Sequence, residues 1–96
     1  MIKLNVQMYY MYILYSGKDK QLYTGFTHDL KSRYKAHVNG FVSATKYRRP
    51  LVLIYYEAYV EQSDAKQRET YLKGGKGKKE LKIQLRHIFE KLKYNT

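Results

Sequence analysis

Residues 8–27 read MYYMYILYSGKDKQLYTGFT, and this stretch decides the fold. Its first part, Met8 to Tyr15, is an apolar and aromatic run without a breaker, which is typical of a buried or half-buried strand. Residues 16–20 contain glycine and charged side chains and predict a turn, and residues 21–26 predict the returning strand. The stretch therefore predicts a β-hairpin with a tyrosine on each strand, Tyr12 and Tyr23.

The length of the turn decides whether these two tyrosines can form one site. Side chains alternate between the two faces of a strand, so Tyr12 and Tyr23 share a face only if the turn has an even number of residues. A two-residue turn at Gly17 and Lys18 would place them opposite each other, and a four-residue turn from Gly17 to Lys20 would place them diagonally. An odd-length turn would separate them, so a joint site requires an even turn.

A helix is expected directly after the hairpin. Thr27 is a good N-cap, Asp29 adds a carboxylate to the first turn, and Gly40 is a stop signal. Between these signals, Arg33 and His37 stand four positions apart, which places their Cβ atoms about 5–6 Å from each other on one face of a helix. Both side chains can therefore reach the same ligand.

The second half of the chain predicts one more strand and two more helices. Residues 51–59 are nearly continuous apolar and aromatic, which indicates a central strand buried on both faces. A helix is expected from Ser63 to its stop at Gly74, and an amphipathic helix over about residues 78–93. The predicted order is β-β-α-β-α-α, an α+β fold in which helices cover a sheet.

Length and composition indicate one domain spanning residues 1–96. The absence of cysteine excludes a disulfide framework, a thiolate metal site and a cysteine nucleophile, and it suits a reducing, cytoplasmic compartment. No run of apolar residues is long enough to span a membrane, and residues 1–4 lack the apolar segment of a secretory signal.

The net charge of +11 predicts a polyanionic partner, most often a nucleic acid. The twelve tyrosines could stack on bases or bond phosphates, although tyrosine is also a good strand former. Two basic segments are expected to contact phosphates, a loop over residues 41–50 and a turn over residues 76–79. The candidate phosphate-binding residues are Lys46, Arg48, Arg49, Lys76, Lys78 and Lys79.

The order and spacing of several short motifs resemble the GIY-YIG nuclease family in its short, single-domain form. The resemblance covers about residues 9–73. The motifs that carry it are Met11-Tyr12-Ile13-Leu14, Leu22-Tyr23-Thr24-Gly25-Phe26-Thr27, Asp29-Leu30 with Arg33 and His37, and the helical block of Ala65, Glu69, Leu72 and Lys73. The resemblance implies a small three-stranded antiparallel sheet flanked by helices, which agrees with the order predicted above.

The resemblance also implies that Glu69 is the single protein ligand of one Mg²⁺ or Mn²⁺ ion, whose other ligands are phosphate oxygens and water. A chain with eight acidic residues suits one metal ion better than two, because a two-metal site needs several clustered carboxylates. The alternative for Glu69 is a solvated helix residue paired with Lys66 or Lys73.

The two tyrosines would act on the attacking water by the same resemblance. Tyr12 would be the general base or would align the water, provided that nearby cations lower the pKa of its phenol; the alternative is a core tyrosine. Tyr23 would bond the water or the scissile phosphate. Gly25 would let the backbone come close to the substrate, or else it marks a bulge.

Arg33 would donate to the phosphate oxygens, since an arginine on the inward side of a helix is costly unless it meets an anion. Its alternative role is an ion pair with Asp29 or Glu57. His37 would assist the base or the phosphate, or it would be structural.

Three positions depart from the family pattern. Met11 replaces the first glycine and Thr24 replaces an isoleucine, both at non-catalytic positions. No asparagine follows the metal-binding glutamate, where Gly74, Gly75 and Gly77 stand instead, and this puts metal geometry or product release in doubt.

Three classes of function follow. The leading hypothesis is a metal-dependent endonuclease that hydrolyses phosphodiester bonds of DNA with low sequence specificity, with RNA as another substrate and structure-selective repair or recombination as a narrower role. No small-molecule cofactor and no membrane partner are expected. The alternative is a nucleic-acid-binding module without turnover, and Glu69 argues against it because a lone carboxylate repels phosphate. A third class would use the last helix to bind a membrane or an acidic protein.

Overall fold

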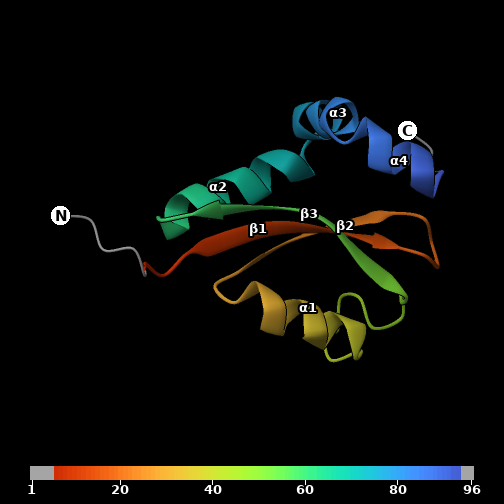
Figure 1. Ribbon diagram of the computed structural model, residues 1–96, viewed down its shortest axis with the longest axis horizontal. Helices are drawn as coiled ribbons and strands as arrows, with labels where there is room; N and C mark the ends of the chain where they lie inside the picture. Colours follow the sequence, from red (N-terminus) through yellow and green to blue (C-terminus); the bar gives the residue numbers. More distant parts are fainter. Residues whose placement is uncertain (1–5, 94–96) are drawn as a thin grey trace.

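The computed structural model describes residues 6–93. Its centre is a three-stranded antiparallel sheet in the order β2-β1-β3. One helix covers one face of this sheet and three helices cover the other (Figure 1). The elements are β1 (Tyr9–Ser16), β2 (Leu22–Thr27), α1 (Leu30–Val38), β3 (Leu51–Tyr59), α2 (Gln62–Lys73), α3 (Gly75–Gln84) and α4 (Arg86–Leu92). The α+β class and the three-stranded sheet predicted from the sequence are confirmed.

The β1–β2 hairpin closes with a four-residue turn. The amide of Ser16 donates to the carbonyl of Gln21 at 2.9 Å, which leaves residues 17–20 between the strands. In this register Tyr12 faces Gly25 and Leu14 faces Tyr23. Tyr12 and Tyr23 therefore lie diagonally on one face, as the four-residue alternative predicts.

The central strand is β1, so the expectation that residues 51–59 form a central strand buried on both faces is wrong. The last six residues of β1 are buried, whereas most of β3 is exposed or half-buried at the edge of the sheet. The tyrosines of β3 explain the difference, because an aromatic ring can pack on the sheet while its hydroxyl reaches a polar partner. Tyr55 and Tyr59, for example, both donate to the carboxylate of Glu57.

Helix α1 begins slightly later than its expected cap. Asp29, not Thr27, is the N-cap, and its carboxylate accepts from the amide of Ser32 at 3.1 Å. Its end is as predicted, with Gly40 in the left-handed region at a φ of 80°. The hydroxyl of Tyr34 donates to the carbonyl of Leu51 at 3.0 Å, which fixes α1 on the sheet.

The C-terminal third differs most from the expectation. Residues 76–79 are not a turn but the first part of α3, and the single helix expected over residues 78–93 is two helices that meet at Leu85. Gly77 shows why a glycine-rich segment is helical here. A Cβ on Gly77 would collide with the Tyr71 carbonyl and the Leu72 Cα, so the glycine allows α3 to pack closely on the end of α2.

The apolar faces of α3 and α4 pack against the sheet. Leu81 and Phe89 are buried in one core cluster with Met11, Ile13 and Leu72. Within residues 6–93 no helix is both long and apolar enough to cross a bilayer. A second cluster, on the α1 face, contains Tyr12, Leu14 and Leu51.

Candidate active site

Tyr12 is the centre of the candidate site. It lies in the middle of β1 with its ring in the core, and 1% of its surface is exposed. Its hydroxyl is 2.7 Å from Nε2 of His37, and Nε of Arg33 donates to the same hydroxyl at 3.4 Å. The hairpin and α1 therefore bring Tyr12 together with Arg33 and His37, which lie more than twenty positions after it in the chain.

His37 is fully buried and has a second partner that the sequence did not reveal. Its Nδ1 is 2.7 Å from Oγ1 of Thr45, which is also fully buried. Thr45 lies in the basic loop after α1, where the charged residues are the stronger signal. A threonine in such a loop has no pattern that marks it as a partner of a histidine, so sequence reasoning missed it.

Tyr23 completes the aromatic part of the site. Its ring centroid is 6.4 Å from that of Tyr12 and 5.2 Å from that of His37, with tilted and edge-on geometries. The pKa of Arg33 is raised, first by its hydrogen bond to Tyr12 and in smaller part by the neighbouring Tyr23. Arg33 thus interacts with both phenols.

Gly25 makes room for Tyr12. A Cβ at this position would lie closer than 3.0 Å to the Cζ, hydroxyl and Cε1 atoms of Tyr12. The group that comes close to the Gly25 backbone in this structure is the Tyr12 phenol, and the approach of this backbone to a substrate stays a prediction. Gly25 pairs with Tyr12 in regular register, so it is not a bulge.

The electrostatics of Tyr12 differ from the expectation. Burial raises the pKa of the Tyr12 phenol, and this outweighs the hydrogen bond and the charge of Arg33, which lower it. The prediction that surrounding cations lower this pKa is therefore wrong for the protein without substrate. The pKa of His37 is lowered to about 4, first by burial and then by the charge of Arg33. At neutral pH the pair is a neutral phenol and a neutral imidazole.

Glu69 approaches the site from the opposite side of the sheet, on α2. Its negative charge is among the causes that raise the pKa of Tyr12. The side chain is 19% exposed, and its carboxylate pairs with Nζ of Lys73 at 3.1 Å. This is one of the two lysine partners proposed for Glu69 as a solvated helix residue, although Glu69 itself is only partly exposed.

Within residues 6–93, no three potential ligands among histidine, aspartate and glutamate cluster to form a complete metal cage. The carboxylate of Glu69 fits an ion that also takes phosphate oxygens and water, since Mg²⁺ commonly binds through one or two carboxylates plus substrate phosphates. The residues therefore fit the single-ligand arrangement.

Arg33 has no carboxylate partner among the described residues. The two proposed partners are engaged elsewhere: Asp29 caps α1, and Glu57 accepts from Arg68 at 2.9 Å. An inward-facing guanidinium whose described partners are phenols is well placed to take an anion.

The basic loop is less uniform than its sequence suggests. Arg48 pairs with Asp19 of the hairpin turn at 2.6 Å and also donates to the Leu22 carbonyl, and Arg49 donates to the carbonyls of Lys46 and Val38. Lys46 is exposed and lies over the ring of Tyr47. Of these three cations, Lys46 is the one without a carboxylate or carbonyl acceptor in the described structure.

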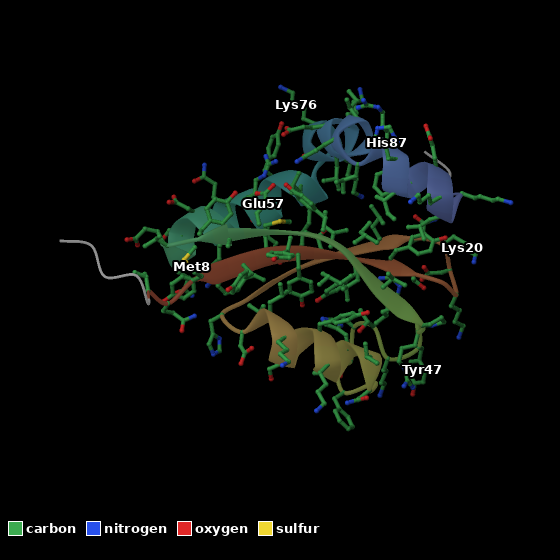
Figure 2. The ribbon with its side chains drawn as sticks, viewed as in Figure 1. Met8, Lys20, Tyr47, Glu57, Lys76 and His87 are labelled. Atoms are coloured by element: carbon green, nitrogen blue, oxygen red, sulfur yellow. The ribbon has the colours of Figure 1, made fainter. Side chains whose placement is uncertain are left out.

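The other predicted phosphate contacts, Lys76, Lys78 and Lys79, are exposed on α3. Figure 2 shows Lys76 in the α3 layer and Tyr47 in the α1 layer, on opposite sides of the sheet. The two predicted basic segments therefore do not form one continuous face.

A hollow lies on each side of the edge strand β2. On the α1 side, a hollow of about 420 Å³ is lined by Arg33, Asp29 and residues of β2. On the other side, a hollow of about 240 Å³ is lined by Tyr23, Lys73 and Lys78. Two residues of the candidate site, Arg33 and Tyr23, thus line hollows on different sides of the same strand.

Comparisons with known proteins agree with this geometry. The model of the GIY-YIG catalytic domain matches residues 8–82. The chain is 45% identical to a UPF0213 protein of Clostridium perfringens over 69% of this chain and 71% of the relative. It is 39% identical to a UPF0213 protein of Pediococcus acidilactici, with 77% and 78% covered. No solved structure matches significantly. The chain therefore belongs to the GIY-YIG family.

Proposed function

We propose that the protein is a metal-dependent endonuclease that hydrolyses phosphodiester bonds of DNA with low sequence specificity. The observation that carries this proposal is the meeting of Tyr12, Arg33 and His37 at one hydroxyl, with Tyr23 beside them. A nuclease domain implies a nucleic-acid substrate, and the net charge of +11 favours a polyanion. Structure-selective cleavage in repair or recombination is a narrower form of the same proposal.

The scissile phosphate would lie over the edge of β2. Arg33 reaches this edge from one side, and Lys73 and Lys78 line the hollow on the other. At 3.4 Å, the bond from Arg33 to Tyr12 is long for an N–H···O hydrogen bond. The negatively charged phosphate oxygens of the transition state would offer Arg33 a stronger, bidentate partner. Movement of the Arg33 side chain toward these oxygens would uncover the Tyr12 hydroxyl.

The proton of the attacking water would pass through Tyr12 to His37. The Tyr12 oxygen takes a proton from the water as the water oxygen bonds to phosphorus, and the proton of the phenol passes to Nε2 of His37. The imidazolium later returns the proton to the Tyr12 oxygen, from which a proton passes through solvent to the leaving oxygen. Without substrate this transfer is unfavourable, because the pKa of Tyr12 is raised and that of His37 is lowered. A bound phosphate would offset the charge of Arg33, one of the two causes of the low His37 pKa.

Glu69 would hold the divalent ion, which supplies charge stabilisation at the phosphate and at the leaving oxygen. Lys73 must then leave the Glu69 carboxylate. Its ammonium lines the hollow that also contains Tyr23, so it can turn to a phosphate of the same substrate. Binding of the ion and of the nucleic acid should therefore favour each other.

Cleavage of labelled DNA duplexes, branched structures and single strands tests the proposal. Purified protein should cut in Mg²⁺ or Mn²⁺ and not in EDTA. Glu69→Gln should abolish cleavage and leave DNA affinity unchanged or slightly higher, because it removes the metal ligand and a repulsive charge. Glu61→Gln, at the exposed start of α2, is the matched control and should cut normally.

Tyr12→Phe tests the role of the phenol. It removes one hydroxyl and keeps the ring, so the rate should fall by about 10²–10⁴, as for a lost general base. Full activity in this variant would reduce Tyr12 to a packing residue, and full activity in Glu69→Gln would remove the metal site. DNA binding without turnover in every condition would leave the non-catalytic binding module as the function.

A further inference from the structure

The bonds around Tyr12 determine where its proton goes. Nε of Arg33 is only a donor, so the Tyr12 oxygen accepts from it. The phenol must then donate its own hydrogen elsewhere. Among the described residues, the acceptor within reach is Nε2 of His37 at 2.7 Å. Nε2 therefore carries no proton in the neutral imidazole.

The proton of the neutral imidazole must then be on Nδ1, which faces Oγ1 of Thr45 at 2.7 Å. The opposite tautomer would direct two donors at the Tyr12 oxygen and leave the phenol hydrogen without an acceptor in a site that is 1% exposed. An unpaired polar hydrogen in such a site is costly. The two bonds of His37 thus favour one tautomer.

We propose that Thr45 is a positioning residue that holds His37 with its proton on Nδ1, and so keeps Nε2 as the acceptor for the proton of Tyr12. The arrangement is a chain from Tyr12 through His37 to Thr45, in which the third member orients the second. It deepens the proposed function, because it gives the loop after α1 a part in the proton route.

The loop is built to hold Thr45 in place. The Thr45 amide donates to the Val42 carbonyl at 3.1 Å. Ser16 Oγ, on the buried end of β1, donates to the Arg48 carbonyl at 2.6 Å, and the amide of Gly17 donates to the Pro50 carbonyl at 2.8 Å. The strand that carries Tyr12 therefore also anchors the loop that carries Thr45.

The tautomer can be measured directly by ¹⁵N spectroscopy of the imidazole nitrogens at neutral pH, because protonated and unprotonated ring nitrogens resonate in different ranges. The chain has three histidines, and the spectrum of His37→Gln assigns the signals of His37. We expect the wild-type proton on Nδ1. A wild-type proton on Nε2 would overturn the proposal, whatever the variants do.

Thr45→Val removes the hydroxyl and keeps the shape. We expect a weaker preference for the Nδ1 proton and a fall in kcat of about 10- to 100-fold, as for residues that orient catalytic or metal-bound histidines, with KM little changed. Thr45→Ser keeps the hydroxyl and should restore most of the rate and the tautomer. An unchanged tautomer in Thr45→Val overturns the positioning role, even if the rate falls.

Ser16→Ala separates positioning from simple loosening of the loop. It removes the Ser16–Arg48 bond without touching His37, so the protein should be less stable but keep the Nδ1 proton. The tautomer is read without substrate or metal. Absence of nuclease activity would therefore overturn the proposed function while leaving the tautomer result to decide on Thr45.

Discussion

Acidification should destabilise the protein through His37, over a pH range that lies mostly above those of the carboxylates with lowered pKa values. The unfolded chain binds a proton at this histidine below about 6.5, whereas the folded protein does so only near pH 4. Between these values the unfolded state holds more protons, so the free energy of unfolding falls as the pH falls, and levels off for this group below about 4. The difference between the two pKa values corresponds to about 3 kcal/mol for this fully buried side chain.

Urea unfolding at several pH values between 7.5 and 4 measures this loss. The carboxylates with lowered pKa values lose their contribution to stability at lower pH. The pKa of Glu57 is lowered from an ordinary value of 4.5, and that of Asp19 is lowered from 3.8 to about 2. His37→Gln should be less stable at pH 7.5 and should lose less stability on acidification to pH 4.5. The exposed His87 provides the matched control, and His87→Gln should keep the wild-type slope. An equal slope in wild type and His37→Gln would refute a buried, neutral His37.

Three further results are expected. Gly25→Ala should lower the free energy of unfolding by about 1–3 kcal/mol and reduce cleavage, because the new methyl group collides with the Tyr12 phenol. Gly75→Ala is the control and should unfold like the wild type, because there is open space around its Cβ. Arg48→Ala should lower the free energy of unfolding by about 1 kcal/mol, because the ion pair with Asp19 is lost. Lys46→Ala should instead reduce the slope of log K against log salt for DNA binding by about 1. The reverse pattern would assign the phosphate contact to Arg48. Arg33→Ala should cost about 2.7–4 kcal/mol of transition-state stabilisation. Arg33→Lys should restore little of it, because an ammonium cannot form a bidentate pair with a phosphate. A wild-type rate for the lysine variant would show that charge alone matters.

Local patterns predicted the hairpin, its four-residue turn as one of two open alternatives, and α1 with Arg33 and His37 on one side. These features depend on turn chemistry, strand alternation and helical spacing, all of which act between near neighbours in the chain. The position of residues 51–59 at the sheet edge depends instead on which strands pair, and composition alone favoured the wrong strand as the centre. The start of α3 was missed because glycine usually ends a helix, whereas Gly77 is needed for close packing on α2.

Side-chain partners were the least predictable part of the candidate site. Charge marked Arg48 as a phosphate contact, but the fold brings Asp19 from the hairpin turn to 2.6 Å from it. Thr45 carries no charge and was not considered, yet it is within 2.7 Å of His37. In both cases the decisive neighbour is more than seven positions away, and only the folded loop determines which side chains meet.

Tyr12 had two competing interpretations, a core tyrosine and a reactive phenol, and its position in the structure is compatible with both. The ring is packed in the core, and the hydroxyl bonds two side chains of α1, Arg33 and His37. His37 in turn bonds Thr45 of the loop after α1. The same burial raises the pKa of the phenol and lowers that of His37, so the unliganded protein keeps both groups neutral. In the proposed mechanism, the phenol becomes reactive when an anion draws Arg33 away and offsets its charge. In this scheme the substrate itself switches on the proton route, which limits activation of the phenol to the complex with nucleic acid.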